Sequence, residues 1–164
     1  MKIQTAGMVL GCAFAMACGG GGSSNAPIAL TGPGFTAPAA QSGTAGGPTD
    51  GSSLGAGCIG MFPTAPQHTV NVAAAIPMLR VLVNAGPSND TTLAVRRPDG
   101  TYVCNDDSGD PGNGLNPVAE VANAAPGEYQ IFVGGYSAGD TWASYNLVLG
   151  EAAGVMPSTA APAP

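Results

Sequence analysis

Residues 91–104 read TTLAVRRPDGTYVC, and this stretch decides the fold. Leu93 and Val95 alternate with residues that face the other way, which is the period of a β-strand with one buried face. A Pro-Asp-Gly turn follows at residues 98–100, where proline presets the backbone of a tight turn and glycine accepts a positive φ. A second short strand is expected at residues 101–104, so the stretch predicts a β-hairpin.

The same period of two recurs along the chain on both sides of this hairpin. Turn-forming sequences such as GPSND, APGE and SAGD separate the alternating segments, and no segment has the period of a helix. Further strands are expected at residues 68–73, 78–84, 117–121, 128–136 and 144–149. Seven or eight short strands at this spacing predict an all-β fold, a single antiparallel β-sandwich of jelly-roll-like character.

The N-terminus has the features of an export signal. In residues 1–17, Lys2 supplies a positive charge, and the apolar stretch after it is too short to span a bilayer. Residues 15–18, AMAC, resemble a bacterial lipobox, in which small residues precede the cysteine that receives the lipid. We therefore expect lipidation at Cys18 and a lipid-anchored protein of the bacterial cell envelope. A plain signal peptide cut after Ala17, giving a secreted protein, is the alternative.

Composition divides the remainder of the chain into three parts. Residues 18–57 are rich in Gly, Ser, Ala, Thr and Pro without periodicity, which predicts a disordered tether. Residues 58–151 carry most of the bulky apolar side chains and are expected to form the sandwich. Residues 152–164 are similar in character to the tether and predict a disordered tail.

Two cysteines, Cys58 and Cys104, belong to the expected sandwich. An even number of cysteines in an exported domain favours a disulfide bond. The bridge would join the beginning of the domain to the end of a strand, with Cα atoms about 4.4–6.8 Å apart. A zinc site is the rival interpretation, but two cysteines and the distant His68 are too few ligands.

The charge of the chain excludes one class of ligand. Charged residues make up 9% of the chain, and the formal net charge is −6 at pH 7. Nucleic-acid binding requires clustered Lys and Arg, and the chain has only four basic residues.

Three runs, taken in order, resemble the bacterial pre-peptidase C-terminal (PPC) domain. They are TLAVRRPDGTYVCNDDSGD, NPVAEVANAAPGEYQIFVGGYSAG and ASYNLVLGE, within residues 67–150. They share with that family a P-D-G turn, an N-D-D strand end, a G-x-Y-x-I-x-V-x-x-Y strand and a final Y-x-L strand. The resemblance implies a β-sandwich accessory domain. It also implies that acidic residues near the N-D-D motif take part in calcium binding in some members.

One enzyme motif occurs in the chain without the residues that it requires. Residues 135–139, GYSAG, match the G-x-S-x-G nucleophile elbow, which requires a following helix and a histidine downstream of Ser137. A strand is expected after the motif, and the one histidine of the chain, His68, lies upstream. A serine hydrolase that uses Ser137 is a remote alternative, and we expect no enzyme.

The sequence therefore predicts a non-catalytic, membrane-tethered lipoprotein with a β-sandwich binding or accessory module. Its partner would be a polysaccharide or a protein, with the membrane reached through the lipid and no nucleic acid bound. Tyr136 and Trp142 are candidate ligand contacts, because exposed aromatic rings stack on sugars and polymers; an edge of the sandwich is the alternative place for Trp142. An envelope structural protein without a specific ligand is the alternative function.

One polar loop, NDDSGDPGN at residues 105–113, is a candidate calcium site. Asn105, Asp106, Asp107 and Asp110 provide oxygen ligands of the type that calcium prefers, although the spacing is not that of an EF-hand. The alternative is a solvated turn that the aspartates cap through hydrogen bonds to the backbone.

Calcium titration distinguishes a calcium site from a turn. If the loop binds calcium, millimolar calcium should raise the melting temperature, because a ligand that binds only the folded state stabilises it. Changing Asp106 and Asp107 together to Asn should abolish the rise. A melting temperature that responds to neither calcium nor a chelator identifies the loop as a turn.

Overall fold

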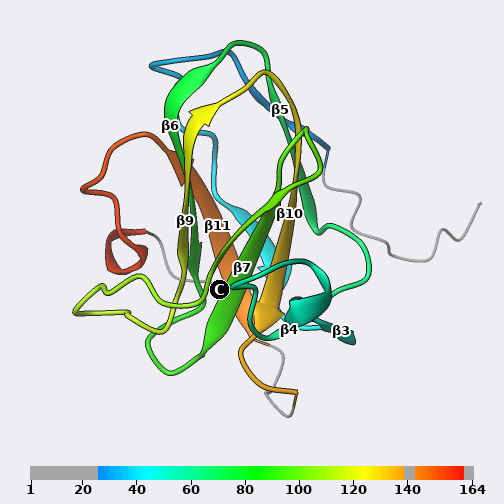
Figure 1. Cartoon of the computed structure of the whole chain (residues 1–164). Coiled ribbons are helices and arrows are strands. Elements are labelled where there is room, and N and C mark those ends of the chain that lie inside the picture. The colour runs from blue at the N-terminus through cyan, green and yellow to red at the C-terminus, as the bar shows by residue number, and fades with distance from the viewer. Residues whose placement is uncertain (1–25, 139–142, 161–164) are drawn as a thin grey trace, which may run out of the picture.

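The computed structural model describes residues 26–138 and 143–160, which form a β-sandwich of two sheets (Figure 1). All seven strands expected from the sequence are present, so the all-β sandwich is confirmed. They are β5 (His68–Val72), β6 (Ile76–Asn84), β7 (Thr91–Arg96), β8 (Tyr102–Asn105), β9 (Val118–Ala124), β10 (Gly127–Gly135) and β11 (Ser144–Gly150).

Four short strands precede these seven and bring the described total to eleven. They are β1 (Ile28–Leu30), β2 (Gln41–Thr44), β3 (Thr49–Asp50) and β4 (Met61–Phe62), with a 3₁₀ turn, η1 (Gly51–Ser53), between β3 and β4. The structure differs here from the expectation of a disordered tether, because residues 28–53 are paired with the sandwich. Each added strand has two to four residues, too few for a sequence period to register, and is held by pairing with longer strands.

The two sheets have seven and four strands. In the seven-stranded sheet, β10 is central: β5 and β4 pair with one edge of it, β7 pairs with the other, and β1, β3 and β8 lie further out. The four-stranded sheet has the order β2-β11-β6-β9. The pair β1–β5 is parallel, and the other described pairs are antiparallel. Because β1 joins one sheet and β2 the other, the N-terminal segment connects the two layers.

The inner faces of the sheets form the main core, as the alternation predicts. Side chains at every second position of β6, β7, β10 and β11 are buried between the sheets: Leu79, Val81, Val83, Leu93, Val95, Tyr129, Ile131, Val133, Tyr145, Leu147 and Leu149.

The outer face of the seven-stranded sheet is also covered. Ala94 and Phe132 point outward from β7 and β10 and pack with Phe62 of β4 into a second small cluster. A disulfide between Cys58 and Cys104, with Cα atoms 5.1 Å apart, joins the covering segment to β8 and confirms the predicted bridge. It closes a loop with a sequence separation of 46, which corresponds to about 4 kcal/mol in the chain-entropy model.

A buried polar pair links the two sheets through the core. His68 of β5 is 2% exposed, and its Nε2 lies 2.7 Å from the hydroxyl of Tyr145 on β11. Burial lowers the pKa of His68 to about 4 and raises the pKa of the Tyr145 hydroxyl. The Tyr145 ring lies directly against Gly43 of β2, where a Cβ would come within 2.3 Å of the hydroxyl oxygen. The pair therefore holds a neutral imidazole in the core and requires glycine at position 43.

This neutral histidine makes stability depend on pH. In the unfolded chain its pKa is near 6.5, so unfolding takes up a proton between pH 6.5 and about 4. Stability should be full above pH 6.5 and fall by about 3 kcal/mol as the pH approaches 4. Urea unfolding at pH 7, 6.5, 5.5 and 5 measures this loss, and the range above pH 5 precedes the titration of most carboxylates.

The variant His68→Gln is the control, because it removes the only histidine of the chain. Its unfolding free energy should be nearly constant between pH 6.5 and 5, whatever its absolute value. A slope equal to that of the parent protein would show that His68 is not the group responsible.

Candidate functional site

The proposed calcium ligands do not converge in the structure. Asn105 ends β8, and its side-chain oxygen accepts a hydrogen bond from the backbone N–H of Val118 at 2.8 Å. Asp106 is half-buried and Asp107 exposed, whereas Asp110 is buried. Within the described residues, no three His, Cys, Asp or Glu side chains are grouped as metal ligands would be. The calcium site stays a prediction, which the effect of calcium on the melting temperature tests.

Asp110 instead anchors the C-terminal segment. Its carboxylate accepts hydrogen bonds from the backbone N–H of Ser158 (2.7 Å), the Ser158 hydroxyl (2.9 Å) and the backbone N–H of Gly112 (2.9 Å). These donors, those of Ser158 first, hold the pKa of Asp110 below its usual range. The loop around Asp110 is therefore a structural connector to residues 152–160.

The C-terminal segment, residues 152–160, covers the outer face of the four-stranded sheet. Arg80 of β6 is buried there and donates to the backbone oxygens of Ala152 (2.8 Å) and Val155 (2.5 Å), while its Nε contacts Glu120 at 3.0 Å. The segment includes a second 3₁₀ turn, η2 (Pro157–Thr159). The structure differs here from the expected disordered tail, because a buried guanidinium needs acceptors and the backbone of this segment provides them.

Buried asparagines connect the same loops. Asn113 donates to the side-chain oxygen of Asn84 at 2.9 Å, and Asn84 donates to the backbone oxygen of Ala160 at 2.9 Å. Asn116, fully buried, donates to the backbone oxygens of Gly86 (3.1 Å) and Asn89 (2.8 Å). Sequence reasoning missed this network, because neutral amides between glycines are typical of any turn.

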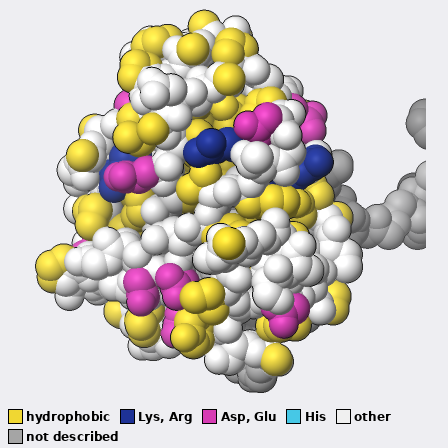
Figure 2. Space-filling model, in the orientation of Figure 1, with side chains coloured by type: hydrophobic (Ala, Val, Ile, Leu, Met, Phe, Trp, Pro, Cys, Tyr) yellow, Lys and Arg dark blue, Asp and Glu magenta, His cyan; other side chains and the backbone are white. Residues whose placement is uncertain are grey.

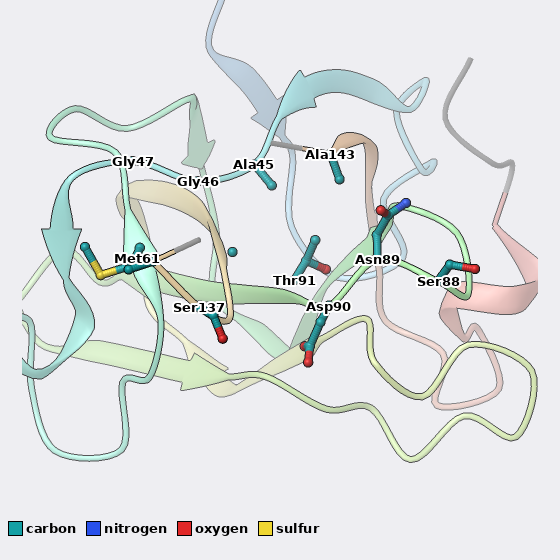
Figure 3. Close-up of a pocket in the computed structure, with 12 residues that line it drawn as sticks. Ala45, Gly46, Gly47, Met61, Ser88, Asn89, Asp90, Thr91, Ser137 and Ala143 are labelled. Carbon is teal, nitrogen blue, oxygen red and sulfur yellow. The ribbon is translucent and has the colours of Figure 1, made fainter. Parts of the chain in front are cut away.

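A pocket of about 270 Å³ lies at the end of the sandwich where β7 begins (Figure 3). Four chain segments and Ala143 surround it. The lining residues are Ala45, Gly46, Gly47, Met61, Ser88, Asn89, Asp90, Thr91, Gly135, Ser137, Ala138 and Ala143. Two other hollows, of about 350 and 310 Å³, lie beside β8–β9 and around Arg97.

Three exposed apolar residues are attached to the beginning of β7, next to residues that line the pocket. The large hydrophobic side chains that are exposed within the described residues are Ile59, Leu115 and Tyr136. Each is attached through its backbone to one of three consecutive residues: the Thr92 hydroxyl donates to Ile59 O (2.7 Å), Thr91 N to Leu115 O (3.1 Å) and Tyr136 N to Asp90 O (3.2 Å). We call Ile59, Leu115 and Tyr136 the apolar rim. The backbones of all three therefore lie near residues 90–92, although none of the three is among the residues that line the pocket.

The structure thus brings Tyr136 and Ser137 to one end of the molecule. Tyr136 is 44% exposed, in agreement with its prediction as a surface aromatic residue. Trp142 and Cys18 lie outside the described residues. The rim residues Ile59 and Leu115 were not predicted, although each is a large apolar residue in a Gly-rich turn, which was the available signal.

The environment of Ser137 differs from a nucleophile elbow. β10 ends at Gly135 and β11 begins at Ser144, so eight residues separate two strands where an elbow has a strand followed by a helix. The only histidine of the chain is buried in the core against Tyr145.

Comparisons with known proteins give no relative. No family model matches the chain, and neither a curated protein nor a solved structure matches it. The resemblance to the PPC domain therefore rests on the sequence motifs alone. No helix among the described residues is long and apolar enough to cross a membrane.

The role of Asp110 can be tested by a substitution that removes its negative charge and keeps its size. Asp110→Asn removes the charge and one of the two acceptor oxygens, so the bonds from Ser158 should weaken and the C-terminal segment should loosen. We expect a melting temperature lower by several degrees and faster proteolysis within residues 152–160. The measurements are thermal unfolding and limited proteolysis with mass spectrometry, both in the presence of a chelator.

The same change at the exposed Asp107 is the matched control. Asp107→Asn should leave both the melting temperature and the proteolysis pattern unchanged under chelation. Equal effects of the two variants would mean that loss of negative charge, and not the anchor at Ser158, is responsible.

Proposed function

We propose that this protein is a non-catalytic binding module, tethered to the membrane of the bacterial cell envelope through Cys18, that holds a polymer at the apolar rim. The observation that carries the proposal is the attachment of the exposed residues Ile59, Leu115 and Tyr136 through their backbones to residues 90–92, two of which line one pocket. Exposed apolar residues near a concavity are typical of binding sites.

The charge distribution supports a neutral partner. Basic side chains are few, and on the face in Figure 2 they lie beside acidic ones. Arg80 contacts Glu120, for example. Such a surface has no positive patch to attract nucleic acid or another polyanion, which favours a neutral polymer.

The position of β1 supports a short connection to the membrane. Nine residues lie between Cys18 and Ile28, where the first described strand begins, so the connection has ten Cα–Cα steps. Such a segment spans at most about 35 Å when fully extended and has a root-mean-square length of about 16–19 Å as a flexible chain. A lipid at Cys18 would therefore hold the sandwich close to the membrane surface.

The rim lies away from this attachment. Ile28 pairs with Val70, which in turn pairs with Tyr129 of β10. From Tyr129 to Tyr136 the strand advances seven residues, or roughly 23 Å. This separation leaves the rim free to meet a polymer while the N-terminal segment is anchored.

Sedimentation with insoluble polymers tests the proposal. Full-chain protein in detergent is mixed with cellulose, chitin or fibrillar collagen, and the bound fraction is measured. We expect retention on at least one of the three, and at least a fivefold loss for Tyr136→Ser, because the exposed ring supplies most of the aromatic contact area at the rim.

Two further variants complete this experiment. Tyr136→Phe keeps the ring and should keep the retention. Cys18→Ala should leave retention unchanged while moving the protein from the membrane fraction to the soluble fraction of its own cells. Retention on none of the polymers, or equal retention for Tyr136→Ser, would overturn the proposed function.

A further inference from the structure

One polar group in the pocket has no hydrogen-bond partner among the described residues. Thr91, the first residue of β7, is 1% exposed, and its hydroxyl oxygen is buried without a hydrogen bond. Its backbone N–H is already used, because it donates to the backbone oxygen of Leu115 at 3.1 Å. Buried hydroxyls are nearly always hydrogen-bonded, so an exception that lines a pocket points to a ligand group that completes it.

The lining of the pocket selects the chemistry of that ligand. Among the described residues that line it there is no Lys or Arg, and Asp90 is the charged one, so an anion would meet a carboxylate. Neutral polar side chains, Ser88, Asn89, Thr91 and Ser137, dominate its polar groups. They offer hydroxyls and an amide, which recognise a partner that both donates and accepts hydrogen bonds.

The size of the pocket and its surroundings narrow the ligand further. A volume of about 270 Å³ is below the usual range for drug-sized ligands and suits one small unit of a larger molecule. Met61, Ala45 and Ala143 supply apolar contacts to the same space (Figure 3). Tyr136 lies between the lining residues Gly135 and Ser137 in the chain, and its side chain is 44% exposed.

We propose that this pocket binds one neutral, hydroxyl-rich sugar unit of a polysaccharide, with the Thr91 hydroxyl hydrogen-bonded to a sugar hydroxyl. The proposal rests on the proposed function and names the ligand class of the same site. The apolar C–H face of the sugar ring packs against Met61, Ala45 and Ala143, while the ring hydroxyls meet the polar lining, as the mixed surface of a sugar requires.

The test separates binding from stability. Full-chain protein in detergent is titrated with glucose, galactose and N-acetylglucosamine, with isothermal calorimetry and saturation-transfer NMR as readouts. At least one sugar should bind, and Thr91→Val should weaken its binding about tenfold. The same variant should have an unchanged or higher melting temperature without sugar, because valine has a similar shape and removes a hydroxyl that has no partner among the described residues.

Two matched variants complete the experiment. Thr91→Ser keeps the hydroxyl and should retain most of the binding. Thr101→Val makes the same chemical change in the exposed turn after Pro98, near the other end of β7, and should leave binding unchanged. The proposal is overturned if none of the sugars binds at tens of millimolar, if Thr91→Val binds as well as the parent, or if that variant melts several degrees lower.

Failure of the sugar proposal is distinguishable from failure of the proposed function. Retention on collagen that is lost in Tyr136→Ser, without any sugar binding, would leave a binding module for a protein polymer and overturn the sugar unit. Retention on no polymer together with no sugar binding would overturn both.

Discussion

The central strands of both sheets are apolar on their two faces, and the rest of the structure depends on this constraint. Three apolar triplets show this: VLV at residues 81–83, LAV at 93–95 and IFV at 131–133. In each, the first and third side chains face the core between the sheets, and the middle one, Leu82, Ala94 or Phe132, faces outward and is also buried. A sandwich with bare outer faces would leave these side chains in water at a cost of roughly 25 cal/mol per Å². The chain therefore has to fold its flanking segments over both sheets.

This requirement explains what could and could not be predicted from the sequence. The seven strands β5–β11 were predictable from alternating apolar positions and turn sequences, and the disulfide because Cys58 and Cys104 were the two cysteines of the expected sandwich. The covering segments were missed because Gly, Ser and Pro give them no period, and their order comes from tertiary contacts such as those of Arg80 with residues 152–155. The unbroken apolar triplets were the available signal, since such runs indicate strands buried on both faces.

The candidate site could be predicted only in part for a related reason. Grouping residues by adjacency joined Asp110 to Asp106 and Asp107, whereas in the structure it binds Ser158, a residue 48 positions later. Tyr136 was predicted because an aromatic residue beside a glycine-rich loop is a surface signal in any fold. The attachment of Ile59 and Leu115 near it depends on hydrogen bonds to their backbone oxygens, from the Thr92 hydroxyl and the Thr91 N–H, which the alternation of apolar residues does not predict.

Hydrogen bonds of side-chain amides indicate that the end of the sandwich beside the pocket is rigid before a ligand binds. Elsewhere in this weakly charged chain, side-chain amides fix the backbone: buried Asn116 holds residues 86 and 89, and the half-buried side chain of Gln67 pairs with both the N–H and the C=O of Val133 on β10. The bonds of Asn116 hold residues 86–89, two of which line the pocket, without a ligand. For the proposed polymer binding, less conformational entropy would then be lost, so a small contact area would suffice for retention on a repetitive polymer.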